Sequence, residues 1–128
     1  MSDLSLKASD TRSVTSTRIS DCLIVTVPDD LGGAQMDLLR EATLNAIHGI
    51  STRAVIFELS GLRFLDSEEF SGLKSIAHMT ERLGSTSIFV GLHPGIVAHL
   101  VQADADLGGI KAKLGLSEAL RSLSVGLA

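Results

Sequence analysis

Residues 54–70 read AVIFELSGLRFLDSEEF, and this stretch decides the fold of the chain. Its first six residues form a nearly continuous β-prone run, which is typical of a central strand covered on both faces. The next six predict a loop that closes on apolar anchors, Phe64 among them. Apolar residues at helical spacing then run from Ser67 to about Leu83. A strand and an apolar loop therefore come first, and a small polar pair, Asp66 and Ser67, lies at the beginning of the helix that follows.

The same alternation of strands and helices extends to both sides of this stretch. We expect a hairpin at 18–27, a helix from Gly33 to His48, a strand at 86–91, a helix opened by Pro94, an edge strand near 110–112 and a final helix capped by Ser117. The order β-β-α-β-α-β-α-β-α predicts an α/β fold with a mixed, mostly parallel sheet of about five strands and about four covering helices. Residues 1–16 are expected as a flexible polar tail, and residues 17–128 as a single domain.

Each predicted helix has one apolar face that we expect in the core. The apolar face of the first helix holds Met36, Leu39, Thr43, Ala46 and Ile47, and the second helix is expected to bury Phe70, Leu73, Ile76, Ala77, Thr80 and Leu83. The third helix is expected to run through Ile96, Val97, Leu100 and Val101, and the last through Leu120 and Leu123. The chain has no Trp or Tyr and only four Phe, so this core is mainly aliphatic.

The composition argues against several kinds of partner. The 128-residue chain has a net charge of −4 and no clustered Lys/Arg run, so it lacks the basic footprint that nucleic acids and anionic membranes require. The scarcity of aromatic residues removes the stacking platform that single-stranded nucleic acid uses. No apolar run is long enough to span a bilayer, and the N-terminal sequence lacks the apolar core of a signal peptide. We therefore expect a cytoplasmic protein.

The sequence offers no catalytic set. His93 and His99 are six residues apart, which places them on different helix faces rather than at metal-chelating spacing. The single cysteine, Cys22, stands in an apolar run and is expected as a small buried hydrophobe. We predict a protein that is not an enzyme and that has no catalytic residues, no cofactor and no metal.

Two interpretations of the polar pair stay open. In the structural one, Asp66 or Ser67 caps the helix, and Glu69 stands at the spacing of a capping box. In the functional one, Ser67 is a phosphoacceptor, because its hydroxyl lies at a helix start where free backbone N–H groups can receive a phosphate. Phosphorylation adds about −1.5 to −2 charges. Beside Asp66, Glu68 and Glu69, this added charge would expel a partner whose surface suits the neutral serine.

Four segments carry a resemblance to a known family: VIFELSGL at 55–62, FLDS at 64–67, LG at 83–84 and IFVG at 88–91. They are similar to the strand, loop, (I/L)DS, helix, LG and strand order of the STAS domain, the SpoIIAA-like fold of anti-sigma factor antagonists. The resemblance covers about residues 19–123. It implies that Ser67 is the phosphorylation site.

A narrower resemblance rests on GLHPGIVAHL at 91–100, DLGGI at 106–110, Leu114 and EAL at 118–120. This pattern is similar to that of stressosome STAS proteins, and the serine after Asp66, together with the lack of an N-terminal sensor domain, favours the RsbS type over the RsbR type. The resemblance implies a scaffold in a large homo- or hetero-oligomer with RsbR-type STAS sensor proteins. Such a scaffold sequesters an RsbT-type serine kinase and is reset by an RsbX-type phosphatase. Partner binding would centre on Asp66, Ser67, Glu68 and Glu69.

Some positions depart from the family pattern. Glu68 and Glu69 stand where apolar residues usually follow the serine, and two fixed charges there would alter recognition by the kinase. Glu58 stands where an aspartate is frequent. His99 stands where some relatives carry a second phosphoacceptor threonine, so we expect no phosphorylation site there. The alternative is a stand-alone SpoIIAA-like antagonist that binds one anti-sigma kinase. A small enzyme or ligand-binding module of the same fold is a third hypothesis.

Overall fold

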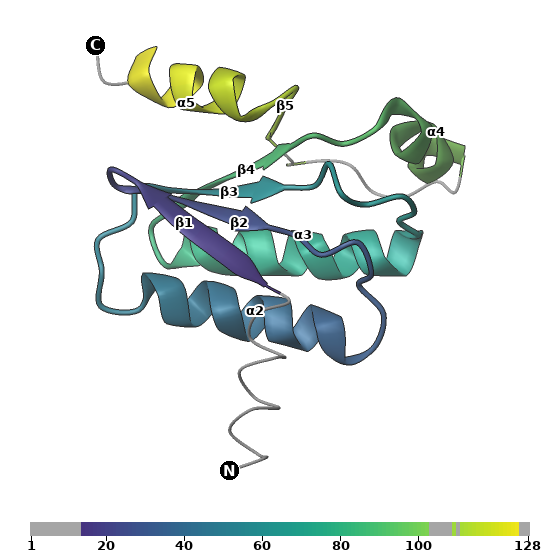
Figure 1. Cartoon of the computed structure of the whole chain (residues 1–128), viewed down its shortest axis with the longest axis horizontal. Helices are drawn as coiled ribbons and strands as arrows, with labels where there is room; N and C mark the ends of the chain where they lie inside the picture. Colours follow the sequence, from purple (N-terminus) through teal and green to yellow (C-terminus); the bar gives the residue numbers. More distant parts are fainter. Residues whose placement is uncertain (1–13, 103–108, 110, 126–128) are drawn as a thin grey trace.

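Five strands form one mixed sheet in the computed structural model, which describes residues 14–102, 109 and 111–125 (Figure 1). The strands are β1 (Thr15–Ile19), β2 (Cys22–Thr26), β3 (Ala54–Glu58), β4 (Thr86–Val90) and β5 (Ala112–Lys113), in the spatial order β1-β2-β3-β4-β5. β1 runs antiparallel to β2, and all other neighbours are parallel. The helices are α2 (Ala34–Ile47), α3 (Ser67–Arg82), α4 (Pro94–Gln102) and α5 (Leu116–Val125). The predicted α/β fold and order of elements are confirmed.

Helices cover both faces of the sheet (Figure 1). α2 and α3 lie on one face, whereas α5 packs on the other against β3, β4 and β5. Side chains alternate between the faces of a strand, so Val55 and Phe57 of β3 join the core under α2 and α3, and Ile56 joins the smaller core under α5. All three are fully buried, which confirms that this strand is covered on both faces.

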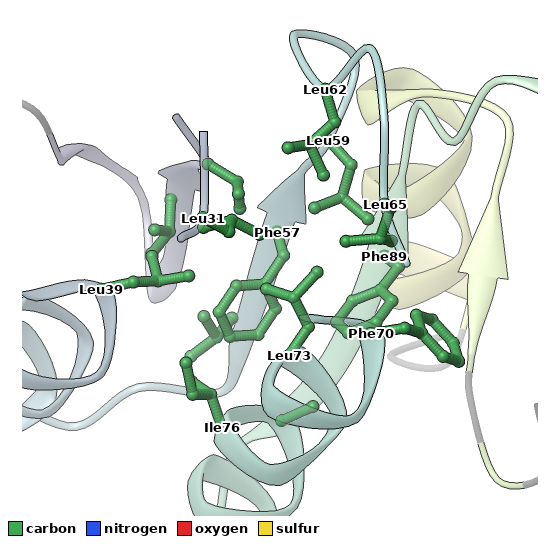
Figure 2. Packing of buried hydrophobic residues seen from close by; sticks show 14 of the residues in the cluster. Leu31, Leu39, Phe57, Leu59, Leu62, Leu65, Phe70, Leu73, Ile76 and Phe89 are labelled. Carbon is green, nitrogen blue, oxygen red and sulfur yellow. The ribbon is translucent and has the colours of Figure 1, made fainter. Parts of the chain in front are cut away.

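The amphipathic face of α3 provides much of the larger core. Its residues Phe70, Leu73, Ile76, Ala77 and Thr80 are buried, as the helical spacing predicts. Figure 2 shows Phe70 and Leu73 beside two phenylalanines of the sheet, Phe57 and Phe89. The Phe89 ring makes edge-on contacts with Phe57 at 5.5 Å and with Phe70 at 6.4 Å between ring centroids. These side chains are core and not interface, because packing has removed them from solvent.

Several local expectations are wrong. Leu83 is 60% exposed rather than buried, because α3 ends at Arg82 and Gly84, with φ +99°, turns the chain away. The helix expected through Ile96, Val97 and Leu100 is present as α4, in which Ile96 and Leu100 supply the buried side and Val97 is 38% exposed; the side chain of Val101 lies outside the described residues. Ser117 lies inside α5 and does not cap it, since the helix begins at Leu116.

The strand boundaries also differ from the sequence prediction. β5 begins at Ala112, and residue 110, where the edge strand was expected to begin, lies outside the described residues. At the other end of the chain, Val14 is buried and β1 begins at Thr15, so the sheet starts within the last residues of the predicted tail. Residues 1–13 lie outside the described part. Among the described residues, no helix is long and apolar enough to cross a membrane.

The parallel strands give the molecule two distinct ends. At one end, here called the carboxyl-end pole, β2, β3 and β4 finish and α2, α3 and α4 begin; at the other, the amino-end pole, these strands start and α2 and α3 finish (Figure 1). Ser67 lies at the carboxyl-end pole because α3 begins there. Loops at this edge of an α/β sheet are the usual place for functional groups.

Candidate functional site

The start of α3 is built around a reciprocal capping box. The Asp66 carboxylate accepts a hydrogen bond from the backbone N–H of Glu69 at 2.7 Å, and the Glu69 carboxylate accepts one from the backbone N–H of Asp66 at 3.0 Å. The carbonyl of Asp66 accepts the N–H of Phe70 at 2.9 Å. Asp66 itself has extended backbone angles, as an N-cap residue should. Of the two candidates that the sequence left open, Asp66 is therefore the cap.

Ser67 is the first helical residue and does not cap the helix. Its side chain is half-buried, and among the described residues its hydroxyl has no hydrogen-bond partner. The backbone N–H groups of Ser67 and Glu68 likewise have no partner within the described part of the chain. Two donors and one hydroxyl thus meet at the positive end of the α3 dipole. The Ser67 hydroxyl therefore contributes no hydrogen bond to the fold among the described residues.

The four residues predicted to bind a partner lie together in one helical turn but differ in their freedom. Asp66 and Glu69 are half-buried and engaged in the capping box, whereas Glu68 is exposed. An open groove of about 460 Å³ runs beside them, between the starts of α2 and α3, with Met36 and Gly72 on its walls. The groove edge is thus acidic. Because Glu69 already bonds to the backbone, Glu68 is the carboxylate that a partner can reach most directly.

The helices meet closely beside this groove. A Cβ on Gly72 would lie only 2.8 Å from the terminal methyl carbon of Met36, so a larger residue there would displace the flexible end of the Met36 side chain. The loop before α2 adds two exposed carboxylates, Asp29 and Asp30, at the same pole. Since opposite charges attract across an interface, a basic protein surface fits this pole best.

The turn after β4 is locked against the loop that leads to Ser67. Gly91 has φ +80°, and a Cβ there would lie 3.0 Å from the backbone nitrogen of Ser60 and 3.1 Å from a carboxylate oxygen of Glu58. Glu58 is half-buried and accepts hydrogen bonds from the backbone N–H of Ser60, at 2.9 Å, and from its hydroxyl. The His93 Nε2 atom lies 2.9 Å from the Ser60 carbonyl oxygen. The GLHP turn therefore helps to hold the loop that presents the serine.

One residue of this pole was misassigned from the sequence. Phe64, expected as an apolar anchor, is 61% exposed, because Leu62 and Leu65 on either side take the buried positions. Its ring contacts the His99 ring at 5.5 Å between centroids, and both line an open groove of about 240 Å³ with Ile96. The burial alternation within the loop depends on the tertiary fold, so periodicity in the sequence gave no reliable signal for it.

No group of three or more His, Cys, Asp or Glu side chains among the described residues could hold a metal ion. Cys22 is buried at the start of β2. Burial raises the pKa of its thiol, and the neighbouring Asp21 carboxylate adds to that effect. The thiol therefore has less nucleophilic thiolate at neutral pH than an exposed cysteine.

The family model of the STAS domain matches residues 13–119. The chain belongs to the STAS domain family. Among curated proteins, none matches this sequence. The resemblance expected from the DS pair and its flanking segments is thereby confirmed.

Three solved structures are similar to this chain over nearly their whole length. A serine-to-glutamate variant of RsbS from Moorella thermoacetica has 23% identity and a TM-score of 0.75, with 89% of this chain and 97% of that chain covered. A chain of the stressosome, a signal integration and transduction hub, has 23% identity and a TM-score of 0.76, with 88% of this chain and 98% of that chain covered. The anti-sigma factor antagonist SpoIIAA in its unphosphorylated form has 14% identity and a TM-score of 0.63, covering 88% and 98%. At these identities the likeness shows the common fold.

Proposed function

We propose that this STAS protein is a non-catalytic scaffold of the RsbS kind, which holds a switch kinase at its carboxyl-end pole and releases it when Ser67 is phosphorylated. The observation that carries the proposal is the Ser67 hydroxyl, which has no partner among the described residues although it stands at a fully built helix start. Asp66 and Glu69 cap the helix without it. A phosphate can therefore be added without dismantling a structural hydrogen bond.

The charge added by a phosphate would act on the partner more than on the fold. Two unit charges about 8 Å apart repel by roughly 0.5 kcal/mol in water and by about 2 kcal/mol at an effective dielectric constant of about 20. The positive end of α3 and the free N–H groups of Ser67 and Glu68 offset part of this repulsion. A partner that packs closely against the neutral serine hydroxyl has no room for a phosphate, and burying the phosphate charge in that contact is costly. Phosphorylation is thus a docking switch that leaves the domain folded.

The partners follow from the same proposal. An RsbT-type serine kinase docks at the acidic groove edge and modifies Ser67, an RsbX-type phosphatase removes the phosphate, and RsbR-type STAS sensor proteins complete a large cytoplasmic assembly. Support comes from the fold shared with RsbS and with the stressosome chain. The acidic groove edge, where Glu68 is the exposed carboxylate, adds the requirement that the docking surface of the kinase be basic.

Phosphopeptide mapping of the protein from its own cells, before and after stress, tests the proposal. Phosphate is expected on Ser67 and not on Ser71, which is exposed on the same helix and serves as an internal control. Ser67→Ala should fold normally and carry no phosphate on this peptide. If the Ser67 peptide is well covered and stays unmodified in both states, the switch does not exist. If Ser71 carries the phosphate, the site assignment is wrong.

The second candidate is a stand-alone antagonist that binds one anti-sigma kinase, and the SpoIIAA fold is the observation in its favour. Both candidates use Ser67, so phosphorylation does not separate them. The molar mass of the complex isolated under gentle conditions does, because a scaffold co-purifies with RsbR-type sensors in a large particle and an antagonist does not.

A further inference from the structure

A second groove, here called the α4 groove, opens at the carboxyl-end pole beside the loop that leads to Ser67. Its volume is about 240 Å³. The loop supplies Arg63, Phe64 and Leu65 to one wall, and α4 and the turn before it supply the other. Leu65 lines this groove, whereas the next residue, Asp66, lines the acidic groove between α2 and α3. The two grooves therefore meet at the segment that leads to Ser67.

Contacts between the two walls hold the α4 groove in shape. The His93 Nε2 atom, in the turn before α4, lies 2.9 Å from the Ser60 carbonyl oxygen, and because a carbonyl only accepts, this nitrogen donates its N–H. The His99 ring, on α4 itself, contacts the Phe64 ring at 5.5 Å between centroids. Both contacts join the α4 side of the groove to the loop. The groove is therefore preformed, and a ligand does not have to order its walls.

The lining of the α4 groove combines an unpaired cation with apolar surface. Arg63 is exposed and has no hydrogen-bond or ion-pair partner among the described residues. Its guanidinium presents N–H donors in a planar fork that fits a carboxylate. Phe64 is 61% exposed, and Ile96 adds to the apolar lining. None of the described residues in this lining is Asp or Glu, whereas carboxylates line the groove between α2 and α3, so the sign of the charge reverses between the two grooves.

These features select one kind of occupant. A carboxylate would form charge-assisted hydrogen bonds with Arg63, and a neighbouring apolar side chain would cover Phe64. A basic segment would instead meet the like charge of Arg63. We propose that the α4 groove docks a segment of a partner protein in which an acidic residue stands beside an apolar one. Its place in the switch rests on the function proposed above, since the kinase seated over Ser67 is the partner that would supply this segment.

The two grooves together fix how such a partner sits at Ser67. The partner presents a basic surface toward α2 and the acidic, apolar segment toward α4. A partner turned the other way would face like charges in both grooves, and specificity is built from such repulsion as much as from attraction. The pair of grooves therefore specifies the orientation of the partner as well as its affinity.

Nuclear magnetic resonance of the full, unphosphorylated, isotope-labelled chain tests the groove directly. The probe is a short capped peptide with a leucine between two glutamates, and the amide signals of the chain are followed during its titration. One control peptide has lysines in place of the glutamates, and another has glycine in place of the leucine. Arg63→Glu reverses the charge of the groove. Arg82→Glu is the matched control, because Arg82 is also an exposed arginine but lies at the amino-end pole; circular dichroism verifies that both variants are folded.

We expect the glutamate–leucine peptide to shift the signals of Phe64, Gly95 and His99. Its affinity should fall roughly tenfold in Arg63→Glu, as for loss of a hydrogen bond to a charged group, and stay at the wild-type level in Arg82→Glu. The inference is overturned if millimolar peptide shifts none of these signals, or if Arg63→Glu leaves its affinity unchanged. It is also overturned if the lysine or the glycine peptide binds in this groove as tightly.

The amount of phosphate on Ser67 in cells connects the groove to the kinase. Arg63→Glu should lower this amount several-fold, and Arg82→Glu should leave it unchanged. If Arg63→Glu carries as much phosphate as wild type, the assignment of the segment to the kinase is overturned. Peptide binding needs no phosphate, so a failed titration leaves the proposed switch standing, and a Ser67 that is never modified leaves the peptide result standing.

Discussion

The capping assignment at α3 makes a quantitative prediction about two adjacent residues. Asp66→Ala removes the acceptor of the Glu69 N–H bond, whose length is 2.7 Å, and a negative charge from the positive end of the helix. Loss of an N-cap acceptor costs about 1 kcal/mol, and the favourable dipole contact about 0.3–1 kcal/mol. We therefore expect Asp66→Ala to lower the free energy of unfolding by about 1–2 kcal/mol. Ser67→Ala removes no hydrogen bond among the described residues and should change it by less than about 0.5 kcal/mol.

Urea denaturation followed by circular dichroism measures both variants. With a dependence on urea of about 2 kcal/mol per molar for a small domain, the midpoint of Asp66→Ala should fall by roughly 0.5–1 M, while that of Ser67→Ala stays near wild type. Asp66→Asn is the matched control, since it keeps an acceptor oxygen without the charge and should lie between the two. A midpoint for Ser67→Ala as low as that of Asp66→Ala would refute the reasoning, because Ser67 would then be a structural cap and not a free phosphoacceptor.

Three further predictions concern the surroundings of the site. Gly91→Ala should destabilise the domain by about 1–3 kcal/mol in urea denaturation, since its φ is +80° and a Cβ would crowd the Ser60 loop. The control is Gly95→Ala, which should be neutral or slightly stabilising because a Cβ there meets nothing within 4 Å. An equal change in stability for the two variants would contradict the strain argument. The buried hydroxyls of Thr80 and Ser87 bond to each other and to the Ala77 carbonyl. Ser87→Ala should therefore lower the free energy of unfolding by about 1–3 kcal/mol. In a double-mutant cycle with Thr80→Val the two losses of stability should be coupled, whereas additive losses would mean that the two hydroxyls act independently. Phe64→Ala should leave the unfolding midpoint nearly unchanged, because its side chain is exposed. It should reduce the amount of phosphate on Ser67 in cells, because an exposed aromatic side chain beside the site is a typical hot spot for binding a partner. Unchanged phosphorylation would show that Phe64 is not part of the docking surface.

The overall plan of the domain was determined by the sequence alone, because it depends on patterns between near neighbours. The apolar run of β3 and the helical spacing of α3 record which side chains must leave water, and burial of the corresponding residues follows directly. The alternation of strands and helices then restricts the topology to a mostly parallel sheet. Since parallel strands end at one edge, the position of Ser67 at the carboxyl-end pole was implicit in that order.

The details of the site were decided only by tertiary structure. Whether Asp66 or Ser67 caps α3 depends on backbone angles that neighbouring residues do not specify, and both side chains are chemically suited to the role. The outward turn of Phe64 toward His99, like the packing of Gly91 against the Ser60 loop, joins segments about 30 residues apart in the chain. Periodicity in the sequence indicates only which residues are buried against near neighbours in the chain. The contacts of Phe64 and Gly91 form because the sheet brings distant loops to one edge, where the core has space for only some of their side chains.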